Sequence, residues 1–284
     1  MYRKLVQLAF YAILLISVGL SACKKDEMQE SSADVTETSD PSSLLVSRIH
    51  YDATNRTDLF TYDQDNRLVT FRSQEILPGN VPFERIEQYQ YNANGKVNRI
   101  ITSYPGSENL ADTAAVKYVD EHTALVTFQR RDENGEQKVF KFEFDKAGQL
   151  MQTSLLHASI NIEDQTNYTF TREANNVLMS TSFNENVNAN LVFTTAYAYD
   201  ATNNPLHAIA KYNPFFNRIV RGNLQVNANE LSQNMVKATD WSVTTASTTY
   251  EVDKTTNYPL SSVTTYDDPN FATETAQYAY VAAK

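Results

Sequence analysis

The sequence predicts an all-β protein, an antiparallel β-meander of repeated hairpins with roughly 16–18 strands. Composition is the first indication, because 17 tyrosines and 14 phenylalanines stand against 7 glycines and 8 prolines, and aromatic residues favour strands. The second is alternation of apolar and polar residues, which gives a strand two different faces. The third is a motif that recurs every 26–29 residues. We expect the meander to curl into a single large sheet, an open barrel or a sandwich.

Residues 1–22 have the order of a lipoprotein signal peptide. Two basic residues precede an apolar run over residues 5–20, which is shorter than the roughly 20 residues of a membrane-spanning helix. Residues Leu20–Cys23 resemble the lipobox of bacterial lipoproteins, in which the cysteine is acylated and becomes the first residue of the mature chain. The resemblance implies that Cys23, the one cysteine of the chain, is the lipidation site. The alternative is an uncleaved anchor helix with a buried cysteine.

Four charged residues follow the cysteine, namely Lys24, Lys25, Asp26 and Glu27. They resemble the export signal of Bacteroidota surface lipoproteins, which implies a lipid-anchored protein of the outer membrane that faces the cell exterior. A generic charged tether is the alternative, and the protein would then face the periplasm. Residues 23–43 as a whole are rich in serine and acidic residues, so we interpret them as a flexible tether.

From residue 44 to residue 284 we expect one β domain built from tyrosine–aspartate-like (YD-like) repeats. An apolar residue ends a strand before each polar turn, and its spacing varies only between 26 and 29 residues. Such a narrow spread indicates one structural unit used repeatedly. We interpret these residues as strand-end packing residues: Tyr62, Tyr91, Tyr118, Phe144, Phe170, Tyr199, Val226, Val252 and Tyr280.

The polar turns after these positions have the chemistry of hairpins. An aspartate or asparagine in the second position accepts a backbone N–H two residues on, and a glycine or asparagine three positions later adopts positive φ. Calcium binding is the competing interpretation, but the turns lack the acidic density of a calcium loop. The turn-forming residues are Asp63, Asn66, Asn92, Gly95, Asp145, Gly148 and Asp200.

The connections at the opposite ends of the hairpins are more variable and polar, so a binding site is expected on that rim. Two features depart from the repeat. Tyr212, Phe215 and Phe216 interrupt the alternation, and Trp241 is the only tryptophan. These four residues are candidate binding residues for a sugar ring or a peptide. Alternatively, they form a capping insertion that covers an open end or edge of the sheet.

The chain resembles lipoproteins of Bacteroidota that carry YD-like hairpin repeats and a characteristic C-terminal order of motifs. Those motifs are Asn213-Pro214-Phe215, then Leu231-Ser232-Gln233-Asn234, then Tyr278-Ala279-Tyr280. More distantly, the turns are similar to the tyrosine–aspartate repeats of Rhs-type and teneurin shells. Met235 departs from the pattern, since a second asparagine is expected there. The resemblance implies a fold and a location, and it implies no activity.

Motifs of known chemistry are missing from the sequence. Its four histidines are scattered, so we expect no metal, and the glycines form no phosphate or dinucleotide loop, so we expect no cofactor. A net charge of −10 makes nucleic acid an unsuitable partner. We find no catalytic residue, although a carboxylate pair of the glycosidase kind leaves no spacing to recognise.

The sequence therefore predicts a non-catalytic, lipid-anchored, monomeric protein of the cell envelope that contacts a glycan or another envelope protein. A surface hydrolase of polysaccharide or peptide that uses paired carboxylates is the alternative. A third possibility is a purely structural component of the envelope.

Overall fold

The computed structural model describes residues 44–106, 111–130, 137–158, 166–184, 191–220, 223–241 and 244–284. The predicted signal peptide, the tether, Cys23 and the four charged residues after it lie outside the described residues, so these predictions stay predictions.

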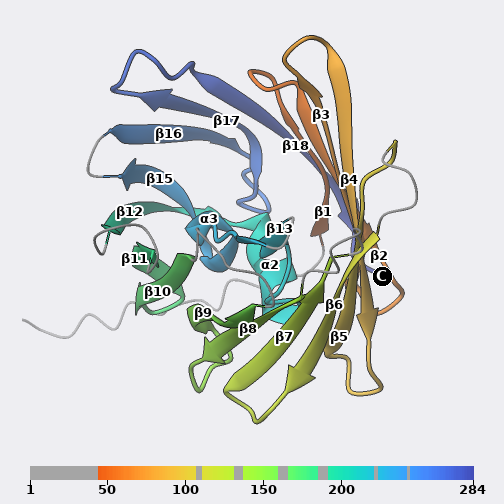
Figure 1. Cartoon of the computed structure of the whole chain (residues 1–284). Helices are drawn as coiled ribbons and strands as arrows, with labels where there is room; N and C mark the ends of the chain where they lie inside the picture. Colours follow the sequence, from red (N-terminus) through yellow and green to blue (C-terminus); the bar gives the residue numbers. More distant parts are fainter. Residues whose placement is uncertain are drawn as a thin grey trace, which may run out of the picture. The chain divides into compact units, whose positions relative to one another are not determined.

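Sixteen antiparallel strands form a closed barrel in which each strand pairs with the next barrel strand in the chain, β12 with β15, and β1 closes the barrel by pairing with β18 (Figure 1). The predicted all-β antiparallel meander is confirmed, and the sheet closes into a barrel. The strands are β1 (Leu44–Tyr51), β2 (Arg56–Tyr62), β3 (Leu68–Leu77), β4 (Val81–Tyr91), β5 (Val97–Ser103), β6 (Ala111–Tyr118), β7 (Thr123–Gln129), β8 (Gln137–Phe144), β9 (Leu150–Ala158), β10 (Thr166–Glu173), β11 (Asn176–Asn184), β12 (Leu191–Asn203), β15 (Asn234–Asp240), β16 (Thr245–Val252), β17 (Pro259–Tyr266) and β18 (Glu274–Ala282).

The two ends of the barrel differ. The turn rim carries the short turns after β2, β4, β8 and β16, and the irregular rim carries the connections β1–β2, β3–β4, β15–β16 and β17–β18. On the turn rim Asp63 Oδ1 accepts the backbone N–H groups of Asp65 at 2.9 Å and Arg67 at 3.0 Å. Asn66, Gly95 and Gly148 have φ of 61°, 73° and 76°. This geometry is that of the hairpin turns that the sequence predicts.

The strand-end tyrosines do more than pack. Several hydroxyls donate a hydrogen bond to a backbone carbonyl of the preceding strand, which ties the two strands together at the turn rim. These bonds run from Tyr62 to Val46 (2.8 Å), from Tyr91 to Leu68 (2.6 Å), from Tyr199 to Val177 (2.5 Å) and from Tyr280 to Pro259 (2.7 Å).

Between β12 and β15 the chain enters the barrel and forms the plug, which comprises residues 204–220 and 223–233 of the described chain. Its elements are α2 (Pro205–Tyr212), a two-stranded sheet of β13 (Ile219–Val220) and β14 (Asn223–Leu224), and α3 (Ala228–Leu231). The plug corrects the predicted turn at Asp200. That residue lies inside β12, where it accepts the backbone N–H of Thr202 at 2.7 Å, and the chain continues into α2 rather than into a strand. The repeat position Val226 also lies in the plug.

Local chemistry explains where α2 begins. Asn204 caps the helix, since its side chain accepts the backbone N–H of Leu206 at 3.0 Å, and Pro205 occupies the first turn. After the helix, Phe215 and Phe216 are 1% and 2% exposed. They pack inside the wall, Phe215 on Phe142 and Phe216 on Phe71, each with ring centroids 5.1 Å apart. Burial of these two rings inside the barrel removes their apolar surface from water.

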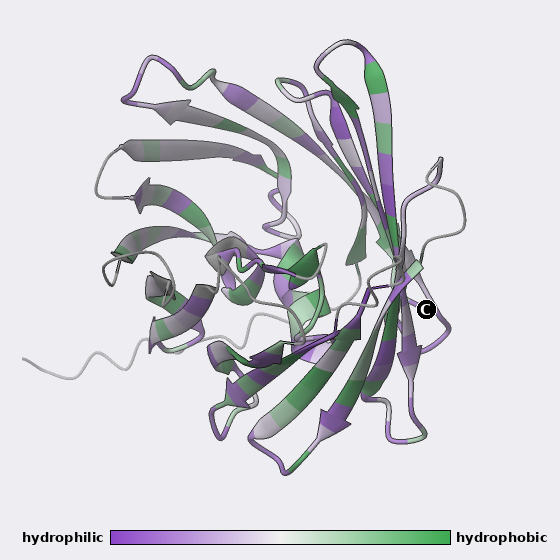
Figure 2. Ribbon diagram, viewed as in Figure 1, coloured by the Kyte–Doolittle hydropathy of each residue, from purple (hydrophilic) through white to green (hydrophobic). Residues whose placement is uncertain are grey.

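Hydrophilic and hydrophobic residues alternate along many of the strands (Figure 2), and successive residues of a strand lie on opposite faces of the wall. On β8, Lys138, Phe140 and Phe142 are buried, and Val139 and Lys141 between them are partly exposed. Phe142 contacts the plug, so the buried positions face inward and the others face outward.

Cross-strand pairing arranges many of the outward residues in three nearly continuous polar rows, which we call the outer rows. The first crosses β2 to β8 at Thr61, Thr70, Gln88, Ile101, Thr113, Gln129 and Gln137. The second crosses β7 to β12 at Thr123, Glu143, Gln152, Thr169, Thr181 and Thr194. The third runs from β16 through β18 and β1 to β4 at Glu251, Ser261, Gln277, His50, Thr57, Gln74 and Glu84. Ile101 is the one apolar residue in these rows.

Candidate functional site

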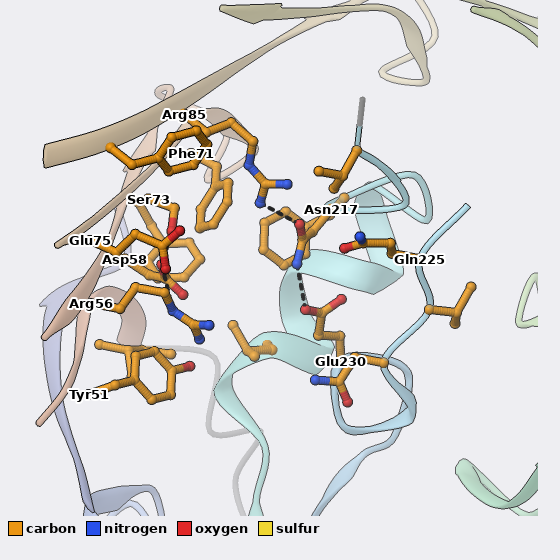
Figure 3. A pocket seen from close by; sticks show the side chains of 18 of the residues that line it. Tyr51, Arg56, Asp58, Phe71, Ser73, Glu75, Arg85, Asn217, Gln225 and Glu230 are labelled. Atoms are coloured by element: carbon orange, nitrogen blue, oxygen red, sulfur yellow. Dashed lines mark hydrogen bonds and ion pairs between the residues drawn. The ribbon is translucent and has the colours of Figure 1, made fainter. Parts of the chain in front are cut away.

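The barrel encloses a cavity of about 710 Å³ between its wall and the plug (Figure 3). We call it the first cavity. Strands β1 to β4 supply one side of it, and the plug supplies the other through residues such as Phe216 and Gln225. The lining includes Leu77 and Phe83, which flank the β3–β4 turn on the irregular rim. Its volume lies within the range of small-molecule sites.

On the wall side, β1 and β2 place an aromatic ring, a cation and an anion together. The guanidinium of Arg56 lies 3.9 Å from the ring centroid of Tyr51, and its Nε lies 3.5 Å from Asp58 Oδ1. Ser73 Oγ donates to the same carboxylate at 2.7 Å. Burial raises the pKa of Asp58 above its usual value, although Arg56 and Ser73 act in the opposite direction.

On the plug side, a chain of polar contacts links β4 to the interior. Arg85 Nη2 donates to Asn217 Oδ1 at 2.6 Å, and Asn217 Nδ2 donates to Glu230 Oε1 at 3.0 Å (Figure 3). Glu230 also forms an ion pair with the fully buried Arg218. Burial raises the pKa of Glu230. These contacts hold the plug against the wall and leave Arg85, Asn217 and Glu230 along the cavity.

A second cavity of about 430 Å³ lies against β15 to β18. Tyr51, Arg56, Val226 and Asn227 line both cavities, so the two are adjoining parts of one interior space. The second cavity is rich in hydroxyl groups and rings, which come from Tyr197, Trp241, Thr248, Tyr250, Ser262, Thr264 and Tyr278. Polar groups of this kind suit the binding of a hydrophilic ligand. The described residues that line this cavity include no histidine, so they contain no Ser-His-Asp triad.

The structure separates the four candidate binding residues. Phe215 and Phe216 are core residues, although Phe216 also reaches the first cavity. Tyr212 ends α2 and is 54% exposed, and Trp241 lines the second cavity. Sequence reasoning missed the charged residues of the first cavity, namely Arg56, Asp58, Arg85 and Glu230. A signal was available for the strand residues, because Asp58 and Arg85 occupy the same strand face as the buried aromatic residues Phe60 and Tyr89.

Within the described ranges, no group of three or more histidine, cysteine, aspartate or glutamate side chains is arranged to hold a metal ion. In the same part of the chain, no helix combines the length and the apolar character needed to cross a membrane.

The fold places the chain among plugged, closed β-barrels of sixteen strands. No protein-family model matches the sequence, and no curated protein matches it. Among solved structures, the chain is similar to a porin-like protein from Bacteroides uniformis, with 13% identity and a TM-score of 0.50 over 83% of this chain and 98% of that one. A porin-like protein from Bacteroides vulgatus is 11% identical, with a TM-score of 0.35 over 84% of this chain and 99% of that one. The likeness to the first of these proteins shows a shared barrel fold.

Proposed function

We propose that the protein is a non-catalytic binding protein of the outer membrane, anchored through the acylated Cys23, whose barrel stands in water and takes a glycan or a segment of an envelope partner into its interior. The observations that carry the proposal are the polar outer rows on the wall and the polar, ring-lined space inside the barrel.

The outer rows argue against a barrel wall in lipid. A membrane-spanning barrel has an outward apolar band about 25 Å tall, whereas here the outward apolar residues Ile76, Met179, Val192 and Val263 are interrupted by outer rows that are polar at every position except Ile101. The outward side chains also pair with each other, since Lys141 Nζ and Glu143 Oε1 lie 2.6 Å apart. A lysine at the middle of a bilayer costs about 2–4 kcal/mol.

Strand length supports the same conclusion. Strands β2, β5, β7 and β15 have seven residues each, fewer than the roughly 9–11 of a strand that spans a bilayer, whereas β3, β4 and β12 have 10, 11 and 13, so the wall lacks a band of uniform bilayer-spanning height. A barrel of this kind needs a separate device to stay at a membrane. The predicted lipid on Cys23 supplies one.

Detergent phase separation tests the anchoring. The acylated full-length protein is expected in the detergent phase, and the same chain produced from Lys24 without acyl groups is expected in the aqueous phase. Recovery of the acyl-free chain in the detergent phase would show that the wall itself enters lipid and would overturn the proposal. Cell-surface location is tested separately by adding protease to intact cells, where a surface protein is cleaved.

Binding is tested with a glycan array and with capture of envelope proteins by the full mature protein. Replacing Gln225, whose side chain lies along the first cavity, by tryptophan is expected to fill the space and reduce binding at least fivefold, on the order of 1 kcal/mol. The matched control is Gln90→Trp on the outer face of β4, which adds the same ring outside the barrel. Equal affinities of the two variants, or failure to retain any glycan or envelope protein, would contradict interior binding.

One observation favours hydrolysis as a second candidate function. Asp58 and Glu230 both line the first cavity, and burial raises the pKa of both carboxyl groups, as is common for acid catalysts. Their present partners, Arg56 and Arg218, instead suit a structural role. Hydrolysis predicts new reducing ends when a bound glycan is incubated with the protein, and loss of that product in Asp58→Asn. A bound glycan that stays intact excludes the candidate.

A further inference from the structure

Three aromatic rings form a continuous stack on the irregular rim. The rings of Trp241 and Tyr266 have centroids 6.1 Å apart at an interplanar angle of 15°, and those of Tyr266 and Phe271 are 5.3 Å apart at 29°. Trp241 follows β15, Tyr266 ends β17, and Phe271 lies in the β17–β18 connection, so two segments far apart in the sequence contribute. Phe271 is 53% exposed, and Trp241 also lines the second cavity. The stack therefore begins in solvent and ends at the cavity.

Asp267 holds the segments that carry these rings in place. Its Oδ1 accepts hydrogen bonds from Thr244 Oγ1 at 2.5 Å and from the backbone N–H of Thr245 at 2.7 Å, and its own backbone N–H donates to the carbonyl of Thr245 at 3.1 Å. The backbone N–H of Trp241 donates to the carbonyl of Thr244 at 3.0 Å. One carboxylate thus links the β15–β16 connection to the β17–β18 connection. A stack braced in this way is preorganised, which lowers the cost of binding a ligand to it.

Hydroxyl groups line the cavity that adjoins the stack. Thr248 Oγ1 and Thr264 Oγ1 are 2.9 Å apart, and Ser262 Oγ and Tyr278 Oη are 3.4 Å apart. Each of these hydroxyls can both donate and accept a hydrogen bond.

The charges of the second cavity balance each other. Its charged lining residues are Arg56 and Glu274, which carry opposite signs. A charged ligand is therefore attracted by one of these residues and repelled by the other, so its net electrostatic interaction with the lining is small. The lining suits a neutral ligand that is rich in hydroxyl groups.

We infer that the ring stack and the second cavity together bind a neutral polysaccharide chain. Flat, partly exposed rings provide an apolar surface that matches the C–H face of a sugar ring, while the sugar hydroxyls need partners that both donate and accept. The outer members of the stack, Trp241 and Phe271, are partly exposed, so the stack offers a sugar unit an apolar surface beside the cavity, and the cavity receives the end of the chain. This inference rests on the proposed binding function and names its ligand class and place.

The single tryptophan makes the test direct, because intrinsic indole fluorescence reports on Trp241 alone. The full mature protein is titrated with three hexasaccharides: β-1,4-linked glucose, α-1,4-linked glucose, and acidic α-1,4-linked galacturonic acid. At least one neutral chain is expected to change the fluorescence with saturation, and the acidic chain is expected to bind more weakly. Calorimetry with Trp241→Ala and Phe271→Ala is expected to show a rise in Kd of about five- to tenfold.

Tyr212→Ala is the matched control, because Tyr212 is 54% exposed, almost the same as Phe271, and lies on the plug helix. It is expected to bind as the unmodified protein does. Glycan binding that both rim variants retain, while Gln225→Trp abolishes it, would overturn the ring-stack site and leave the proposed function standing. A protein that binds no saccharide on the array and none of the three hexasaccharides would overturn this inference, and binding of an envelope protein alone would leave only the broader function.

Discussion

Acidification is expected to destabilise the plug through His207. This residue lies on α2, and its Nδ1 is buried without a hydrogen-bond partner among the described residues. Burial lowers the pKa of His207 from its ordinary 6.5 to about 4, and the positive charges of Arg172 and Lys211 act in the same direction. The folded protein therefore holds a neutral imidazole at a pH at which the unfolded chain has already bound a proton.

The sign and the size of the effect follow from this difference. Because the pKa is depressed in the folded state, the stabilising contribution is fully present above pH 6.5 and is lost as the pH falls toward 4. The two pKa values correspond to about 3 kcal/mol in total, of which about 2 kcal/mol is lost by pH 4.5.

Urea unfolding at pH 7 and at pH 4.5 measures this loss. The variant His207→Gln has no imidazole to protonate, so its stability should fall by about 2 kcal/mol less than that of the unmodified protein over this interval. His157→Gln, which replaces an exposed histidine of β9 outside the plug, is the matched control. An identical loss of stability in the unmodified protein and in His207→Gln would refute the argument.

Two further predictions concern the turns and the core. Gly148→Val should cost about 1–2 kcal/mol in unfolding free energy through strain at positive φ, because no atom crowds the site. Ala147→Val in the same turn should cost less, and equal unfolding midpoints would refute the claim. Phe215→Ala should cost about 3–5 kcal/mol, because it leaves a cavity beside Phe142, whereas truncation of the exposed Leu156 should cost under about 1 kcal/mol. Similar costs for both truncations would contradict the buried position.

The parts of the fold that follow from neighbouring residues were predictable. The turn at Asp63 depends on a carboxylate that reaches an N–H two residues along the chain, and the left-handed conformation of Gly148 depends on the missing side chain of that residue alone. The strands were predictable for the same reason, since alternation is a local pattern.

The plug was not predictable, although parts of its sequence were noticed. Phe215 and Phe216 look exposed in a chain of strands because they break the alternation, and only the closed wall around them provides a place to bury both. The first cavity was missed for a related reason. Arg85 and Glu230 are far apart in sequence, and Asn217 connects them only after the plug has entered the barrel.

The strands, the turns between them and the two-faced character of the wall each depend on contacts within a few residues, so they follow from the sequence. It also carries the predicted lipid attachment at Cys23. Only the tertiary structure decided that β1 meets β18, that the polar rows face outward, and that Trp241 stacks with Tyr266 and Phe271. Alternation gives each strand two different faces but does not determine which of them encloses the core. Closure of the sheet into a barrel determines that.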